Sequence, residues 1–472
     1  MPQKSRWRAF AVLSAVQLVI IIDSSIVYVA LPTIQTDLGF SPAGLAWVVN
    51  AYMIAFGGLL LLSGRLGDLI GRKRMFVVGL STFTAASLLC GLAVSQAMLV
   101  AARFVQGAGG AMASAVVMSI IVTIFQEPRE LAKAVGAIGF VAAVGGAVGG
   151  TAGGLLTQAA GWSWIFFVNV PIGVVAVVLA VRLLADDRGS GLAVGADITG
   201  AFLVTAGLMV GVYTIVKVEQ HGWGSAHTLG LGAVSIALLA AFAARQASAR
   251  SPLMPLGVFR SRNLAGANLV QVLMVASMSG FQFLTVLYLQ RVVGYGAAET
   301  SLAGLPIALV LAVVSLGLSA RMSTRFGPRA VLLAGLVLLA AALAWFTRAP
   351  VDGGYLVDVL PSMVLLGVGG GLAMPAVMTL AMSGVRPGDA GLASGLAGTG
   401  AQVGGALGLA ALAALASGRT ARLTAAGQST ISGLNAGYHL AFGAGAGLLA
   451  TAVIVGFVIL RPEPAGPPQE NP

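Results

Sequence analysis

Apolar stretches about as long as a lipid bilayer is thick recur along this chain of 472 residues. A helix of about 20 apolar residues crosses the hydrocarbon core, because each residue adds 1.5 Å. Only 9% of the residues are charged, against roughly 25% in soluble domains, so the chain has too little polar surface to face water. The sequence therefore predicts an all-α polytopic protein of the cell membrane, with the lipid bilayer as its surroundings.

About fourteen membrane spans are expected. They lie near 8–30, 45–66, 75–94, 98–123, 133–158, 163–184, 197–216, 226–246, 263–290, 299–320, 328–347, 355–383, 391–416 and 437–460. If the N-terminus is cytoplasmic and the loops alternate, roughly three-quarters of the 26 Lys and Arg residues fall on the cytoplasmic side. Both termini are thus predicted to be cytoplasmic. The first span is expected to be retained rather than cleaved as a signal peptide.

A weak internal repeat divides the chain. GRLGDLIGRKRM (64–75) has a degenerate echo in ARMSTRFGPRAV (320–331), and glycines of the fifth span recur in the thirteenth at nearly the same offset. With 65 glycines, chance is the alternative. The shared offset predicts two homologous six-helix halves, here called the N-terminal half (1–184) and the C-terminal half (263–460). Two inserted spans occupy 185–262, and a polar, Pro-rich tail, predicted to be disordered, occupies 461–472.

One acidic residue, Asp23, lies deep inside a predicted span, in LVIIIDSSIVYVALP (18–32). An aspartate at the centre of a span costs roughly 2.5–3.5 kcal/mol, and such acids usually face a partner or a water-filled cavity. Burial favours the neutral acid and a nearby cation favours the carboxylate. An acid balanced between the two can take up and release a proton. The alternative is a structural acid satisfied by Ser24, Ser25 or a neighbouring helix.

Arg103, in the fourth span, is the matching cation. The first span leads outward, so Asp23 is expected about 20 Å above the cytoplasmic face. The fourth span leads inward, so Arg103 is expected about 8 Å below the outer face of a core about 30 Å thick. These depths agree and predict that Arg103 pairs with Asp23, although Arg103 could instead snorkel to the outer interface. The equivalent positions of the C-terminal half are Ser279 and Val359, so ion coupling is assigned to the N-terminal half.

The loop after the second span concentrates glycine and charge. Asp68 can pair with Arg72 or cap a helix N-terminus, and Gly64 and Gly71 allow close approach and a sharp turn. We expect a cytoplasmic gate that forms and breaks, and the alternative is positive charge that only sets topology. The predicted gate residues are Gly64, Asp68, Gly71, Arg72 and Lys73.

GGAVGGTAGG (145–154) places glycines every four residues along the fifth span, in two adjacent stripes. Small residues at this spacing let helices pack backbone to backbone, which predicts a helix held between two neighbours, or one that bends. Static packing alone is the alternative. The predicted packing residues are Gly145, Gly149, Gly150, Gly153 and Gly154.

Isolated polar residues among adaptable apolar side chains suit an amphiphilic organic ligand. Hydrogen bonding between helices, or contact with lipid, is the alternative for each residue. The candidate substrate-cavity residues are Asn50, Tyr52, Gln106, Gln271, Met274, Met278, Phe281 and Gln282.

Other functional classes find little support in the sequence. The three histidines fall in predicted outer loops, and no carboxylates stand at metal-ligand spacing, so neither an enzyme nor a metal site is expected. No phosphate-binding loop joins a strand to a helix, which argues against ATP-driven transport. The basic residues are dispersed, so no nucleic-acid partner is predicted. No cofactor is expected.

These motifs together resemble the Major Facilitator Superfamily, and within it the 14-span drug:proton antiporters (QacA/EmrB-like). The similar segments are IDSSIVYVALP, GRLGDLIGRKRM, RFVQGAGGAM, GGAVGGTAGG, WSWIFFVNVPIG and GLASGLAGTGAQVGGALG. The chain departs from that pattern at Gly150, where the family motif has proline. The resemblance implies the two-half transporter fold and export of amphiphilic compounds in exchange for protons, driven by the proton motive force. The alternatives are a proton symporter that imports a small solute, a dedicated secondary-metabolite exporter and a non-transporting membrane sensor.

Overall fold

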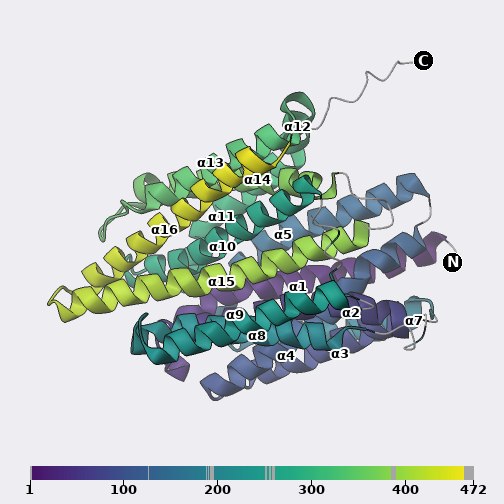
Figure 1. Ribbon diagram of the computed structural model, residues 1–472, viewed down its shortest axis with the longest axis horizontal. Coiled ribbons are helices and arrows are strands. Elements are labelled where there is room, and N and C mark those ends of the chain that lie inside the picture. The colour runs from purple at the N-terminus through teal and green to yellow at the C-terminus, as the bar shows by residue number, and fades with distance from the viewer. Residues whose placement is uncertain are drawn as a thin grey trace.

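A computed structural model describes residues 3–125, 127–187, 189, 191, 196–249, 252–254, 257, 261–383 and 390–461. Within these ranges every regular element is a helix, and the long helices lie side by side along one axis (Figure 1). The predicted disordered tail lies outside the described residues, apart from Arg461.

The N-terminal half contains α1 (Gln3–Leu38), η1 (Gly44–Ala46), α2 (Trp47–Ile70), α3 (Arg72–Gly91), α4 (Gln96–Ile124), α5 (Pro128–Ala160), α6 (Trp164–Phe167) and α7 (Asn169–Leu183). The inserted pair is α8 (Ile198–His221) and α9 (Ala226–Ser248). The C-terminal half contains α10 (Arg262–Arg291), α11 (Ala297–Val313), η4 (Val314–Ser319), α12 (Ala320–Phe326), α13 (Pro328–Phe346), η5 (Tyr355–Val359), α14 (Leu360–Met382), α15 (Ala390–Ala425) and α16 (Thr430–Ile459).

Among the described residues, 13 helical segments are long and apolar enough to span a membrane. The 33-residue helix α5 is not one of these 13 segments, and it occupies the place of the predicted fifth span. The predicted fold class is confirmed. Three predicted spans are composite: the sixth joins α6 to α7, the tenth joins α11 to α12 through the π-helical turn η4, and the twelfth begins with the π-helical turn η5.

Two turns lie at equivalent places of the internal repeat. Gly71 separates α2 from α3 with φ 105°, and Gly327 separates α12 from α13 with φ 82°. Both values lie in the left-handed region that side chains with a Cβ rarely adopt. The aligned glycines therefore make the same kind of sharp turn, as the repeat predicts.

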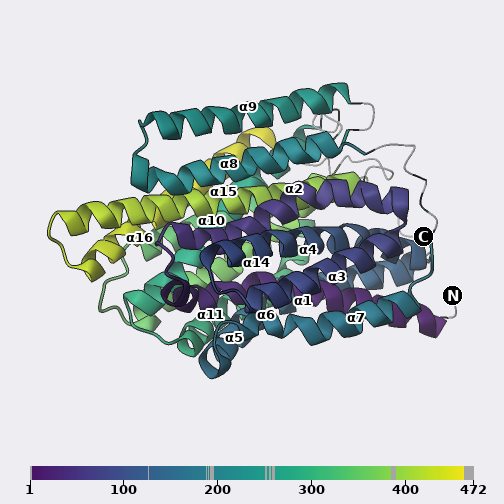
Figure 2. The same cartoon turned by 90° about the horizontal axis from the view of Figure 1, so that it is seen from below.

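The helix contacts between the halves are also related by the repeat. The offset relates α2 to α11 and α5 to α15, and the two large interfaces between the halves are α2 with α15 and α5 with α11. The inserted helices break this symmetry. Helix α8 packs on both α2 and α15, and α9 packs on α8 (Figure 2). One of the two seams between the halves is therefore covered by an extra layer.

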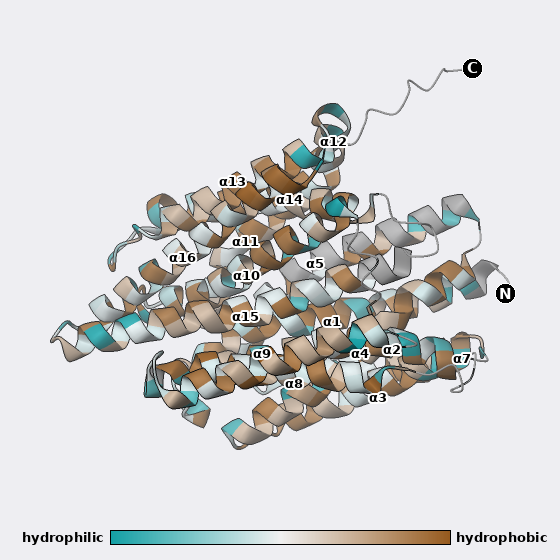
Figure 3. Ribbon diagram, viewed as in Figure 1, coloured by the Kyte–Doolittle hydropathy of each residue, from teal (hydrophilic) through white to brown (hydrophobic). Residues whose placement is uncertain are grey.

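The N-terminal end of α1 and the C-terminal end of α16 lie at the same end of the bundle (Figure 1). We call this the proximal end, and the opposite end, with the loops 39–46, 92–95, 291–297 and 425–430, the distal end. Large apolar side chains such as Phe202, Ile236 and Val313 are 68–72% exposed on the outer helix faces. Hydrophilic residues gather toward the helix ends (Figure 3), as expected for a lipid-exposed bundle.

The hydrophobic core differs between the two ends. One continuous cluster of buried side chains joins Ile26, Leu31 and Val48 of the N-terminal half to the core of the C-terminal half, which includes Phe281 and Tyr288. The proximal part of the N-terminal half forms a separate cluster in which every member comes from that half. Among the described residues, the two halves thus share a core at the distal end and not at the proximal end.

Candidate functional site

A buried ion pair stands at the centre of the N-terminal half. Asp23 on α1 is 0% exposed and Arg103 on α4 is 1% exposed. The Arg103 Nη1 atom lies 2.7 Å from Asp23 Oδ2. The contact expected from the matching depths in the sequence is therefore present, and Arg103 does not snorkel to an interface.

Two amides complete the shell of the Asp23 carboxylate. Gln106 Nε2 donates to Asp23 Oδ1 at 2.8 Å, and Asn169 Nδ2 donates to the same oxygen at 2.6 Å. With Arg103, three donors from α4 and α7 converge on one carboxylate of α1. Since a carboxylate accepts hydrogen bonds and a neutral acid must donate one, this shell fits the ionised form of Asp23.

Arg103 has further partners. Its Nε donates to the Val48 carbonyl oxygen of α2 at 3.0 Å, and its Nη1 also donates to Gln106 Oε1 at 2.7 Å. The guanidinium lies over the Tyr52 ring, 4.3 Å from the ring centre. These contacts compensate the cost of burying a charge.

Local sequence explains how these side chains meet. Gln106 lies three residues after Arg103, so both project from one face of α4. Gln106 Nε2 also donates to Ser87 Oγ of α3 at 2.8 Å. Asn169 is the first residue of α7, just after the short helix α6 ends. The cluster therefore ties α1, α2, α3, α4 and α7 together.

A cavity of about 550 Å³ lies between the halves, lined by α1, α5, α10, α11, η4 and α14. Three predicted cavity residues, Met278, Phe281 and Gln282, are among its lining residues. The volume falls in the range of small-molecule sites.

The other five candidates for the cavity do not line it. Gln106 and Tyr52 belong to the ion-pair cluster, and Asn50 is fully buried on α2. Met274 is 1% exposed within the apolar core, and Gln271 lies on the same helix as Met274 without reaching the cavity. Sequence alone does not fix the rotation of a helix about its axis, and the rotation decides which of its polar residues face the ligand space.

The ion pair and the cavity use opposite sides of α1. Ser25, Tyr28 and Val29 line the cavity. At 3.6 residues per turn they lie about 200°, 140° and 240° around the helix from Asp23. Asp23 therefore faces α4 and α7, and its carboxylate does not line the cavity.

Three of the predicted gate residues, Asp68, Arg72 and Lys73, take part in a network of ion pairs and hydrogen bonds at the proximal end. Arg72 Nη2 lies 3.1 Å from Asp68 Oδ1. The backbone N–H groups of Arg72 and Lys73 both donate to the Asp187 carboxylate, at 2.6 and 3.1 Å. Asp187 thereby caps the N-terminus of α3 from the segment after α7. Gly71 makes the turn with Asp187 against it, and Gly64 lies on α2 near Ala115.

A second acid extends this network. Lys73 Nζ lies 2.9 Å from Asp186 Oδ1, and this hydrogen bond lowers the pKa of the exposed Asp186 carboxyl below its usual range. The network links the α2–α3 turn to the segment that leads into the inserted helices. A gating role for these residues stays a prediction.

The two glycine stripes of α5 contact different neighbours. Gly145, Gly149 and Gly153 face α1, and a methyl group at 149 would lie 2.9 Å from Ser25 Cβ. Gly154 packs on α11, and the Gly150 carbonyl accepts a hydrogen bond from Ser301 Oγ at 2.7 Å. Helix α5 is therefore held between one helix of its own half and one of the other half.

Sequence reasoning missed several of these residues. The tandem acids Asp186 and Asp187 are conspicuous in a chain with only 15 acidic residues, and they directly follow a predicted span. Asn169 is a lone amide in an apolar run, which is the same kind of signal that singled out Asp23. The hydroxyl of Ser87 carries no comparable signal.

Known sequences similar to this chain are transport and resistance proteins. The chain matches the Major Facilitator Superfamily over residues 13–409. It is 38% identical to the puromycin resistance protein pur8 of Streptomyces alboniger, over 97% of this chain and 92% of that one. It is 40% identical to the cephamycin export protein CmcT of Amycolatopsis lactamdurans, over 83% and 81% of the two chains.

Solved structures show the same fold. A bacterial homolog of the human lysosomal transporter Spinster, in an inward-facing and unoccupied conformation, superposes with a TM-score of 0.68 at 18% identity, covering 97% of this chain and 98% of that chain. The POT family transporter PepTSo gives a TM-score of 0.69 at 17% identity, covering 96% and 97%.

Proposed function

Because the chain belongs to the Major Facilitator Superfamily, we propose that it is a secondary exporter of amphiphilic organic compounds, driven by protons that move inward. Its multi-pass bundle would sit in the cell membrane with both termini in the cytoplasm. The observation that carries the proposal is the fully buried Asp23–Arg103 pair. Ionisable groups inside a membrane bundle commonly mark ion and proton pathways.

The proton would act on the helix packing of the N-terminal half. A proton on Asp23 removes the charge that Arg103, Gln106 and Asn169 satisfy, and the neutral acid turns from pure acceptor into donor. At least one of these donors must then turn away. Helix α1 is thereby released from α4 and α7.

Substrate and proton would be coupled through α1 itself. Since the cavity lies on the opposite side of α1 from Asp23, substrate and proton do not compete for the same atoms. A displacement of α1 would instead change the cavity wall formed by Ser25, Tyr28 and Val29. Each proton that crosses a potential of 100 mV supplies about 2.3 kcal/mol to this exchange.

The cavity lining narrows the substrate class. The lining side chains that the structure describes are apolar or neutral and polar, and none of them is Asp, Glu, Lys or Arg. Met278, Phe281 and Met363 offer adaptable apolar contact, and Gln282 and Ser301 offer hydrogen bonds. This chemistry suits amphiphilic antibiotics without a fixed charge. The names of the similar proteins favour export over import by symport, and a dedicated secondary-metabolite exporter stays within the proposal.

Transport into inside-out membrane vesicles tests the proposal. Wild-type vesicles should accumulate radiolabelled puromycin when the lumen is acidified, and Asp23→Asn should reduce this uptake at least about tenfold. Asp37→Asn is the matched control, because Asp37 lies on the same helix and accepts a hydrogen bond from Trp162. Equal transport by Asp23→Asn would show that Asp23 is structural. No accumulation of any compound in an amphiphile panel would contradict drug export.

A further inference from the structure

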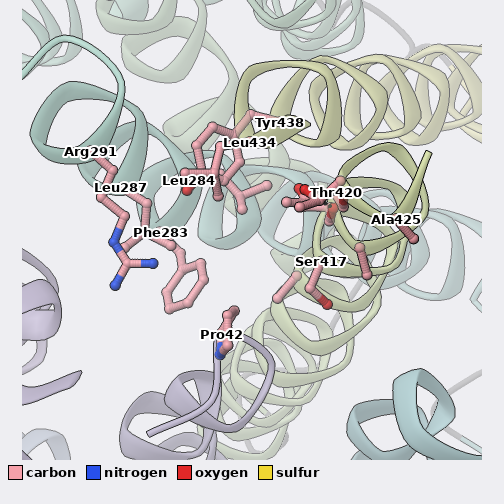
Figure 4. Close-up of a pocket in the computed structure, with 14 residues that line it drawn as sticks. Pro42, Phe283, Leu284, Leu287, Arg291, Ser417, Thr420, Ala425, Leu434 and Tyr438 are labelled. Atoms are coloured by element: carbon pink, nitrogen blue, oxygen red, sulfur yellow. Dashed lines mark hydrogen bonds between the residues drawn. The ribbon is translucent and has the colours of Figure 1, made fainter. Parts of the chain in front are cut away.

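A second cavity, of about 380 Å³, opens at the distal end of the bundle. Its walls come from the distal ends of α10, α15 and α16, and Pro42 of the loop after α1 closes one side (Figure 4). It is therefore mainly a feature of the C-terminal half, whereas the proton site belongs to the N-terminal half.

Helix α10 separates this cavity from the central one. Phe283, Leu284 and Leu287 face the distal cavity, whereas Gln282 and Thr285 face the central cavity. None of the described residues lines both cavities. The distal cavity is thus a distinct site and not an extension of the substrate space.

Its chemistry is that of an apolar slot with one cation. Among the lining residues that the structure describes, Arg291 is the single charged one, and most of the others are Leu, Phe, Ala and Pro. Arg291 interacts with the Tyr438 side chain, and it forms no ion pair with a carboxylate in the part of the chain that the structure describes.

The threonine hydroxyl groups of the lining form hydrogen bonds within α15. Thr420 Oγ1 donates to the Ala416 carbonyl at 2.9 Å, and Thr424 Oγ1 donates to the Thr420 carbonyl at 3.0 Å. They add little donor capacity for a ligand. Arg291 therefore favours a ligand with an anionic group, because the paired N–H groups of a guanidinium match a carboxylate or a phosphate.

The cavity is also long and graded from apolar to polar. It follows α15 from Ala413 to Ala425, which is about 18 Å at 1.5 Å per residue. Phe283 lies nearer the bundle centre, and Arg291 ends α10 at the distal surface. We infer that the distal cavity binds an anionic amphiphile, with its carboxylate or phosphate at Arg291 and its apolar body along α15. The alternative role of Arg291 is to offset the carbonyls at the end of α10.

Equilibrium binding of radiolabelled palmitate to the purified protein in an uncharged detergent tests this site. Arg291→Gln should weaken palmitate binding at least about tenfold, because a charged hydrogen bond is lost. Arg422→Gln is the matched control, since Arg422 is an exposed arginine of the same distal end that does not line the cavity. Ala421→Phe should also block binding, because it fills the cavity from an exposed position.

The uncharged analogue hexadecanol should bind equally to the wild type and to Arg291→Gln. Displacement of palmitate by phosphatidylglycerol would identify a membrane lipid as the occupant. If phosphatidylglycerol does not displace palmitate, the occupant is a free carboxylate compound and not a membrane lipid. Unchanged palmitate binding in Arg291→Gln, or an equal loss in Arg422→Gln, would overturn the inference. The readout is independent of transport, so the proposed function can fail while this site stands.

Discussion

At the scale of single residues, the Asp23 cluster behaves as one unit. Removing one partner of a buried ion pair costs roughly 3–5 kcal/mol, because the remaining charge is left without compensation. Arg103→Gln should therefore lower the apparent melting temperature of the protein in detergent. The double variant Asp23→Asn with Arg103→Gln should recover most of this loss and still fail to transport. Additive losses in a thermal-shift assay would show that the two side chains do not act as a pair.

The sequence is sufficient to predict this ion pair, but it does not predict all the side chains that surround it. A lone acid and a lone arginine at matching depths in apolar spans leave few other ways to be satisfied. Asn169 and Ser87 could not be assigned, because an amide or a hydroxyl is tolerated on almost any face of a membrane helix. The sequence places Gln106 in the substrate cavity for the same reason, although its spacing from Arg103 favours the ion pair.

At the scale of the helix, α5 offers a matched pair of substitutions. A methyl group at Gly149 would lie 2.9 Å from Ser25 Cβ and 3.0 Å from the Ile22 carbonyl oxygen, whereas a methyl group at Gly150 meets nothing within 4 Å. Gly149→Ala should cost about 1–3 kcal/mol by overpacking against α1. Gly150→Ala should be neutral or stabilise by up to about 1 kcal/mol, because alanine favours the helix. Thermal unfolding of both variants measures these changes in stability. Equal effects would contradict the assignment of Gly149, and not Gly150, to the face of α5 that packs on α1.

The glycine spacing predicts that α5 packs closely against its neighbours. It does not predict which neighbouring helix each stripe contacts. The i, i+4 pattern is a property of one helix, whereas the partner is set by the packing of the two halves. The same limit applies to the α2–α3 turn. The charges of that loop were evident in the sequence, but the capping of α3 by Asp187 depends on a segment more than a hundred residues away.

At the scale of the whole molecule, the halves are joined at one end. Besides the shared apolar core, hydrogen bonds such as the following two join the halves in the part of the chain that the structure describes. Gln290 Nε2 donates to the Val29 carbonyl at 3.1 Å, and Ser301 Oγ donates to the Gly150 carbonyl at 2.7 Å. With the proximal core of the N-terminal half separate from the C-terminal half, this arrangement holds the distal end closed.

Breaking both hydrogen bonds should therefore shift the balance between closed and open distal ends. At about 1 kcal/mol each, Gln290→Leu with Ser301→Ala should raise the open fraction roughly 30-fold. Spin labels at Ala97→Cys and Gln428→Cys, both exposed near the distal end, should report a longer distance by electron spin resonance.

Ser277→Ala is the control, because it removes a similar bond to Gly445 within one half. The native Cys90 is fully buried and should not take up label. If the control opens the distal end as far as the double variant does, the bonds between the halves do not set the conformation, and the shared apolar core alone must hold that end closed.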